Sequence, residues 1–139
     1  MAVRILLAGL IAGLVSNLTG YLIVGRWFHS YQARTPATWR SHESWNHYLY
    51  STAIRVVACI GLAALYAHFG AVMIEIPGSP LTSAAAFALC LWAVTVLPLV
   101  VEAALFVNWH PGFVAGLLLD WLVICLVACV IAGFAMRGG

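Results

Sequence analysis

Hydrophobic side chains fill four long stretches of the chain, and most polar side chains collect between them. The stretches cover approximately Ile5–Trp27, His47–Phe69, Leu81–Val107 and Gly112–Met136. A helix needs about 20 predominantly apolar residues to cross the ~30 Å hydrocarbon core of a bilayer. Each stretch reaches this length, so the pattern predicts an all-α fold, a four-helix transmembrane bundle that forms one domain over residues 1–139.

The connections between these stretches predict further local structure. Segment 28–46 is the longest polar stretch, and within it Thr35 is followed by Pro36. A capping side chain followed by proline is typical of the first residues of a helix. We therefore expect a short interfacial helix near Pro36–Trp45, between the first and second spans. The connection Asn108–Pro111 is so short that the third and fourth helices must be antiparallel neighbours.

Two further prolines affect the third span. Ser79 followed by Pro80 predicts the start of this helix by the same capping logic. Pro98 lies inside the apolar stretch, where it removes one backbone hydrogen bond. We expect the third helix to be kinked there.

Composition agrees with a lipid environment. Hydrophobic residues make up 65% of the chain and charged residues only 7%, whereas soluble domains carry about a quarter charged residues. The mean hydropathy is +1.05. The net charge of +2 includes no basic run of the kind that nucleic-acid binding requires. The expected partner is the lipid bilayer and not a nucleic acid.

The cysteines fit the same picture. All four lie within apolar stretches, and none forms a C-x-x-C pair. Cysteine is among the most readily buried residue types. We therefore interpret them as packing residues without disulfides.

The arginines give an orientation. An even number of spans places both termini on one side of the bilayer, which we call face A, and segments 28–46 and 108–111 on the other, face B. The arginines near face B are Arg26, Arg34 and Arg40, and those near face A are Arg4 and Arg137. Because cytoplasmic loops carry an excess of basic residues, the pattern favours a cytoplasmic loop 28–46.

Small residues recur at helix-packing spacing in the first and last spans. Gly9 and Gly13 form a G-x-x-x-G pair, as do Gly112 and Gly116. Each pair is followed one turn later, on the same helix face, by a polar residue (Asn17 in the first span and Asp120 in the last). Such stripes let helix backbones approach closely. Packing within one chain and contact between copies both remain open.

The most informative residues are polar side chains inside the spans, because a charge in lipid is costly and usually requires a partner. Counted inward from face B at 1.5 Å per residue, one such residue from each helix lies at a similar depth of roughly 11–15 Å. These four are Asn17, Arg55, Glu102 and Asp120. We expect a buried polar layer in which Arg55 compensates Glu102 and Asp120.

Two interpretations of this layer remain open. It could be a structural network that fixes helix register, or it could be a proton or ion relay or a pocket for a polar ligand. Additional relay or ligand contacts could come from Thr95, Ser51, His47 and His110.

Other chemistry has little support. His29, His42, His47 and His110 gather near face B, but no compact His, Cys or carboxylate spacing typical of a metal site appears. No Ser/His/Asp signature, phosphate loop or nucleotide fingerprint is present. We expect no metal, no cofactor and no catalytic residues. A membrane enzyme or metal-handling protein that uses these histidines is the third alternative.

Three features together resemble a known family. They are Gly25-Arg26-Trp27-Phe28 at the end of the first span, Glu102 to Phe106 at the end of the third, and Gly116 with Asp120 in the last. Their layout is similar to that of small bacterial four-helix membrane proteins classed as a domain of unknown function. Segment 28–46 and the cysteines depart from that pattern. The resemblance implies a bacterial inner-membrane location and no particular chemistry.

The sequence therefore predicts a small integral membrane protein without catalytic activity. It would serve as an accessory or structural subunit of a larger membrane complex, or as a homo-oligomer. The alternative is a small proton- or ion-coupled transporter or channel that uses Arg55, Glu102 and Asp120.

Overall fold

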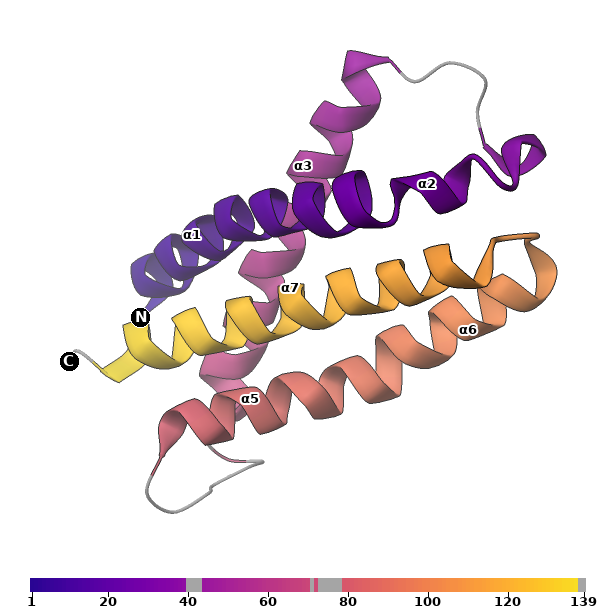
Figure 1. Cartoon of the computed structure of the whole chain (residues 1–139). Helices are drawn as coiled ribbons and strands as arrows, with labels where there is room; N and C mark the ends of the chain where they lie inside the picture. The colour runs from indigo at the N-terminus through magenta and orange to yellow at the C-terminus, as the bar shows by residue number, and fades with distance from the viewer. Residues whose placement is uncertain (40–43, 71, 73–78, 138–139) are drawn as a thin grey trace.

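The computed structural model describes residues 1–39, 44–70, 72 and 79–137 of the chain. Four helices are long and apolar enough to cross a membrane, which confirms the all-α four-helix fold and is compatible with an integral membrane location. Both termini lie at the same end of the molecule (Figure 1). The spans are Ala2–Trp27, Trp45–Gly70, Leu81–Phe106 and Pro111–Met136.

Three of the four spans change from α-helical to π-helical hydrogen bonding along their length, and the fourth is one α-helix. The first span consists of α1 (Ala2–Gly20) and η1 (Tyr21–Trp27). The second consists of α3 (Trp45–Leu65) and η3 (Tyr66–Gly70). The third consists of α5 (Pro80–Leu91), η4 (Trp92–Val96) and α6 (Leu97–Phe106), and the fourth is α7 (Pro111–Arg137).

The third span begins and changes where its prolines predict. The side chain of Ser79 accepts a hydrogen bond from the backbone nitrogen of Thr82 at 3.4 Å, so it caps α5. The π-helical segment η4 ends two residues before Pro98. Because proline has no N–H and its ring crowds the preceding turn, irregular hydrogen bonding on its N-terminal side is the expected consequence.

A short helix does lie between the first two spans, but it is not where the capping pattern placed it. It is α2 (His29–Gln32), and Pro36 begins only a 3-10 turn, η2 (Pro36–Thr38). Trp39 is extended, with φ −101° and ψ 154°, so no helix continues through it. The expected helix over Pro36–Trp45 is therefore wrong in extent, and its residues 40–43 lie outside the described part of the chain.

The fourth span is the central element of the bundle. Helix α7 lies between α1 on one side and α5 with α6 on the other, and α3 crosses them at a steep inclination (Figure 1). Contacts join α7 to α1, α3, α5 and α6. The connection 108–111 is too short to separate the helices it joins, so α6 and α7 are neighbours.

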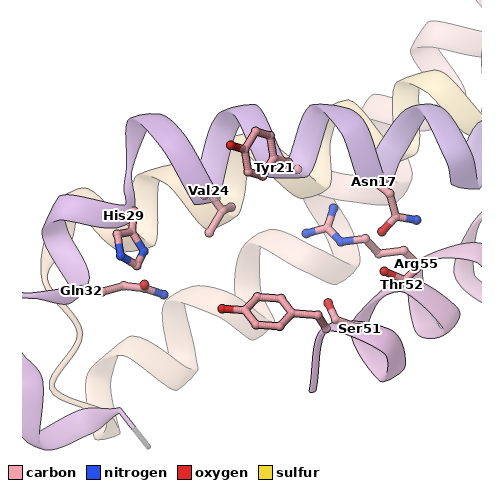
Figure 2. A pocket seen from close by; sticks show the side chains of 11 residues that line it. Asn17, Tyr21, Val24, His29, Gln32, Ser51, Thr52 and Arg55 are labelled. Atoms are coloured by element: carbon pink, nitrogen blue, oxygen red, sulfur yellow. The ribbon is translucent and has the colours of Figure 1, made fainter. Parts of the chain in front are cut away.

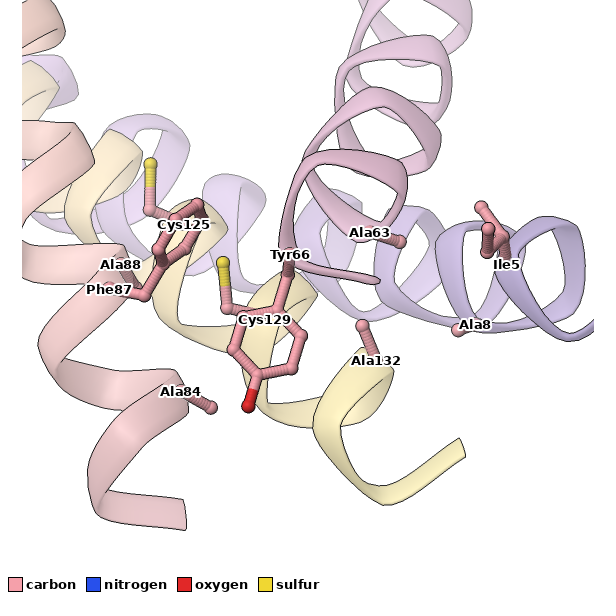
Figure 3. Packing of buried hydrophobic residues seen from close by; sticks show 10 residues of the cluster. All are labelled: Ile5, Ala8, Ala63, Tyr66, Ala84, Phe87, Ala88, Cys125, Cys129 and Ala132. Carbon is pink, nitrogen blue, oxygen red and sulfur yellow. The ribbon is translucent and has the colours of Figure 1, made fainter. Parts of the chain in front are cut away.

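Small side chains fill the core near face A. Figure 3 shows this cluster, in which Tyr66 and Phe87 meet edge to face with ring centroids 5.6 Å apart. Cysteine and alanine supply most of the remaining surface, and small residues let membrane helices approach closely. The cysteines are free thiols. The cluster contains Ile5, Ala8, Ala63, Tyr66, Ala84, Phe87, Ala88, Cys125, Cys129 and Ala132.

The glycine stripe of the first span packs against the backbone of another helix. A Cβ atom at Gly9 would lie 2.5 Å from Cα of Ile60, and one at Gly13 would lie 2.9 Å from Cα of Val56. Both neighbours belong to α3. These glycines therefore set the closest approach of α1 and α3.

The glycine stripe of the last span has a different neighbour. A Cβ atom at Gly112 would meet the ring of Tyr31 at 2.7 Å, and one at Gly116 would clash with the side chain of Phe28. The absent side chains on α7 thus make room for two aromatic rings from the segment after the first span. In this chain both stripes are used for packing within one molecule.

Candidate functional site

The centre of the site is an ion pair between two spans. On α3, Arg55 donates from Nη1 to Oδ1 of Asp120 at 3.1 Å and from Nη2 to Oδ2 at 2.5 Å. The Asp120 side chain on α7 is 0% exposed and that of Arg55 is 18% exposed. Two parallel bonds between a guanidinium and a carboxylate give a stronger and more directional contact than a single bond.

The first span completes this contact. Nη1 of Arg55 also donates to the backbone oxygen of Ser16 at 3.3 Å, so the guanidinium joins α1, α3 and α7. One turn later, a Cβ atom at Gly20 would clash with the guanidinium. Gly20 is not among the site residues that the sequence predicts, although it continues the helix face of Gly13 and Ser16 at spacings of three and four residues.

Asn17 lies near this pair without joining it. Its amide nitrogen donates to the backbone oxygen of Gly13 in its own helix at 2.8 Å. The residue instead lines a cavity beside Arg55. Asn17 therefore belongs to the site as part of a cavity wall.

Glu102 does not join the layer that the sequence predicted. It is exposed on α6, and no ion pair or hydrogen bond links it to any residue that the structure describes. The physical reason is its rotation about the helix axis. Val100, two residues earlier, is buried, and two residues of an α-helix turn through about 200°. The face that packs inward therefore leaves Glu102 outside.

The four additional candidate contacts lie apart from the pair. Thr95 is exposed and donates to the backbone oxygen of Leu91 at 2.6 Å. His47 accepts a hydrogen bond from the backbone nitrogen of Ser44 at 3.0 Å and so caps α3. Of the four, only Ser51 lines the cavity beside Arg55.

His110 has a comparable local role at the start of α7. Its Nδ1 accepts from the backbone nitrogen of Gly112 at 3.0 Å, and its ring stacks on Tyr31 with centroids 4.7 Å apart. Nη1 of Arg34 lies 3.5 Å from its Nε2. The imidazole of His110 therefore caps α7 and packs on an aromatic ring.

A cavity of about 420 Å³ separates the first span from the N-terminal half of α3. Figure 2 shows Arg55, Asn17 and Thr52 at one end of it and His29 with Gln32 at the other. The steep inclination of α3 creates this space, because the two spans are in contact at Gly9 and Gly13 and diverge toward face B. The lining residues are Asn17, Gly20, Tyr21, Val24, Gly25, His29, Gln32, Tyr48, Ser51, Thr52 and Arg55.

The lining combines polar and apolar surface and contains no carboxylate. Hydroxyl, amide, imidazole and guanidinium groups face one another across the space, and several of their residues, including Tyr21 and Ser51, are exposed. The cavity is therefore open at its side. A site with convergent donors and one cation can bind a polar molecule, whereas nothing in this lining supplies a paired acid and base for catalysis.

Metal binding has no counterpart in the geometry of the described ranges. Within residues 1–39, 44–70, 72 and 79–137, no three His, Cys, Asp or Glu side chains gather closely enough to hold a metal ion. His42 lies outside these ranges.

Comparison of the chain with protein-family models, with curated proteins and with solved structures found no match. The resemblance to small bacterial four-helix membrane proteins therefore stays a prediction.

Proposed function

We propose that this protein is a non-catalytic integral membrane subunit that assembles with further copies of itself. We place it in a bacterial inner membrane with segment 28–46 on the cytoplasmic side, as the arginine distribution favours. The observation that carries the proposal is the position of Glu102. A carboxylate on the outer surface of an apolar span is costly unless a partner covers it.

The surroundings of Glu102 support an intermolecular partner. It lies four residues before the end of α6 at Phe106, about 6 Å along the helix axis. The neighbouring side chains of Leu99, Leu105 and Phe106 are large, apolar and exposed. A second protein surface would cover both the charge and this apolar face.

A matching cation lies on the opposite flank of the same molecule. Arg26 is exposed one residue before the end of η1, and no ion pair within the described ranges includes it. Both residues are close to face B, and their helices lie on opposite sides of α7 (Figure 1). Copies placed side by side would therefore bring Arg26 of one copy to Glu102 of the next, a head-to-tail contact that can close into a ring.

Charge reversal tests this contact. Arg26→Glu and Glu102→Arg should each shift the purified protein toward monomer, measured by cross-linking in bilayer nanodiscs, and the double variant should restore the oligomer. Arg34→Glu, which changes charge near face B outside the spans, is the matched control and should leave the oligomer intact. A monomeric wild-type protein, or a double variant no better assembled than the singles, would refute the proposal.

The transporter alternative receives less support. Asp120 is fully buried and bonded through both oxygens to Arg55, so its carboxylate has no open route to either face. Glu102 lies on a different surface. A relay through all three residues would need contacts that these positions do not provide.

A further inference from the structure

The Arg55 guanidinium has hydrogen-bonding capacity that the described residues do not use. Its hydrogen bonds to the described residues all come from Nη1 and Nη2. Among the described residues, every buried side-chain nitrogen or oxygen has a partner. Nε of Arg55 has no hydrogen-bond partner among these residues, so it is not buried. Arg55 lines the cavity beside α1.

The unused donors have a defined geometry. A guanidinium presents five N–H groups in a planar fork. Asp120 occupies the edge between Nη1 and Nη2, and Ser16 takes the remaining hydrogen of Nη1. The edge formed by Nε and Nη2 stays open. Such an edge matches two oxygens of one phosphate or carboxylate.

We propose that this cavity binds the phosphodiester head group of a membrane phospholipid, with two phosphate oxygens on the open edge of Arg55. The hydroxyls of Ser51 and Thr52 line the same space and can donate to further oxygens. No carboxylate faces the bound phosphate, because Asp120 is fully buried behind Arg55.

Charge selects among head groups. The Arg55–Asp120 pair is formally neutral, so a phosphodiester that carries its own cation, as a zwitterionic head group does, adds no net charge to the membrane interior. The exposed ring of Tyr21 on the cavity wall offers an aromatic face to that cation. The volume of about 420 Å³ lies within the usual size of small-molecule sites.

Apolar surface beside the cavity can contact the acyl chains of the phospholipid. Leu18 and Leu22 are exposed next to the lining residues of the first span, and Leu49 is exposed next to those of α3. Acyl chains can lie on this surface while the head group enters from the open side. A free phosphate would gain nothing from it, so we assign the site to a lipid. This site uses neither Arg26 nor Glu102 and is independent of the proposed oligomer contact.

The test is native mass spectrometry of the full chain released from micelles that contain dioleoyl phosphatidylethanolamine, dioleoyl glycerol or inorganic phosphate alone. Retention of the phospholipid over the diacylglycerol is expected, with no retention of inorganic phosphate. Arg55→Lys keeps a cation for Asp120 but removes the second edge, and it should weaken retention about tenfold or more, the value of a hydrogen bond to a charged group. Equal retention of phospholipid and diacylglycerol, or phosphate binding as tight as phospholipid binding, would overturn the assignment.

A second variant tests the site without changing Arg55, so that misfolding cannot explain a loss of binding. Gly25→Leu places a large side chain in the cavity wall, where a Cβ atom meets only Tyr21 at 3.4 Å or beyond. It should abolish phospholipid retention without changing the melting temperature. Gly61→Leu makes the same change on α3 in open space and should retain lipid as the wild type does. Undiminished retention by Gly25→Leu would refute the site.

Discussion

Arg55 on α3 and Asp120 on α7 are joined by two hydrogen bonds of 3.1 and 2.5 Å, although 65 positions separate them in the sequence. The same guanidinium bonds the backbone of α1 at Ser16. One side chain thus connects three of the four spans. Its loss should affect the whole bundle and not only one interface.

Removal of the Arg55 charge alone should lower the unfolding free energy strongly. Arg55→Met leaves the Asp120 carboxylate buried without a partner, and breaking a buried pair in this way typically costs about 3–5 kcal/mol of unfolding free energy. The double variant Arg55→Met/Asp120→Leu removes both charges and should recover most of that loss. Unfolding by titration of a denaturing detergent measures both. Equal destabilisation of the single and double variants would contradict a dominant role for the charge pair.

Close packing of the first two spans gives a second prediction. Gly9→Val places methyl groups where the backbone of Ile60 already lies, and a backbone cannot move aside as a flexible side chain can. Overpacking should lower the unfolding free energy by about 1–3 kcal/mol. Gly61→Val, in open space on α3, is the control and should change it by less than half as much. Comparable losses in both variants would mean that this packing is not the cause.

A third prediction concerns the segment after the first span. Gly116→Val should displace the Phe28 ring that occupies the space above this glycine. Backbone amides of α2 should then exchange hydrogen faster, as hydrogen–deuterium exchange measures, because its packing on α7 is lost. Exchange in the face-A half of α7 should stay unchanged. Uniformly faster exchange along the whole helix would instead indicate global destabilisation.

The indole of Trp92 gives a fourth prediction. Its Nε1 donates to the backbone oxygen of Leu118 at 3.0 Å, linking the third span to α7. Trp92→Phe keeps an aromatic ring but removes this donor, so it should cost about 0.5–1.5 kcal/mol. Trp45→Phe, at a side chain 78% exposed, should be nearly neutral in the same unfolding titration. A neutral Trp92→Phe would show that water or lipid replaces the bond without loss.

The spans could be predicted because hydropathy is a local property of the sequence, and a run of apolar residues is enough to identify a membrane-spanning helix. Their observed limits differ from the expected ones by three residues or fewer. The helix expected over Pro36–Trp45 was less successful. A capping pair starts a turn, but continuation depends on tertiary contacts, and here Trp39 packs edge to face on Phe113 with centroids 4.7 Å apart.

The depth of the site residues in the bilayer could be predicted from the sequence, but the direction in which each side chain points could not. Counting residues from face B placed Arg55 and Asp120 at one level, where the structure brings them together. The same count included Glu102, whose rotation about α6 turns it outward. A single sequence gives the rotation of a helix only when its apolar face is distinct, and the third span is apolar along most of its length. The cavity depends on the inclination of α3, which no local pattern encodes.

The central position of α7 has a consequence for biosynthesis. Chains are made from the N-terminus onward, so α7, which contacts each of the other three spans, is synthesised after them. Until α7 is made, Arg55 resides in a nascent chain whose carboxylate partner, Asp120, has not yet been synthesised. Truncation before Asp120 would leave that chain permanently incomplete, and membrane quality-control proteases would have an unpaired guanidinium by which to distinguish it from the finished protein.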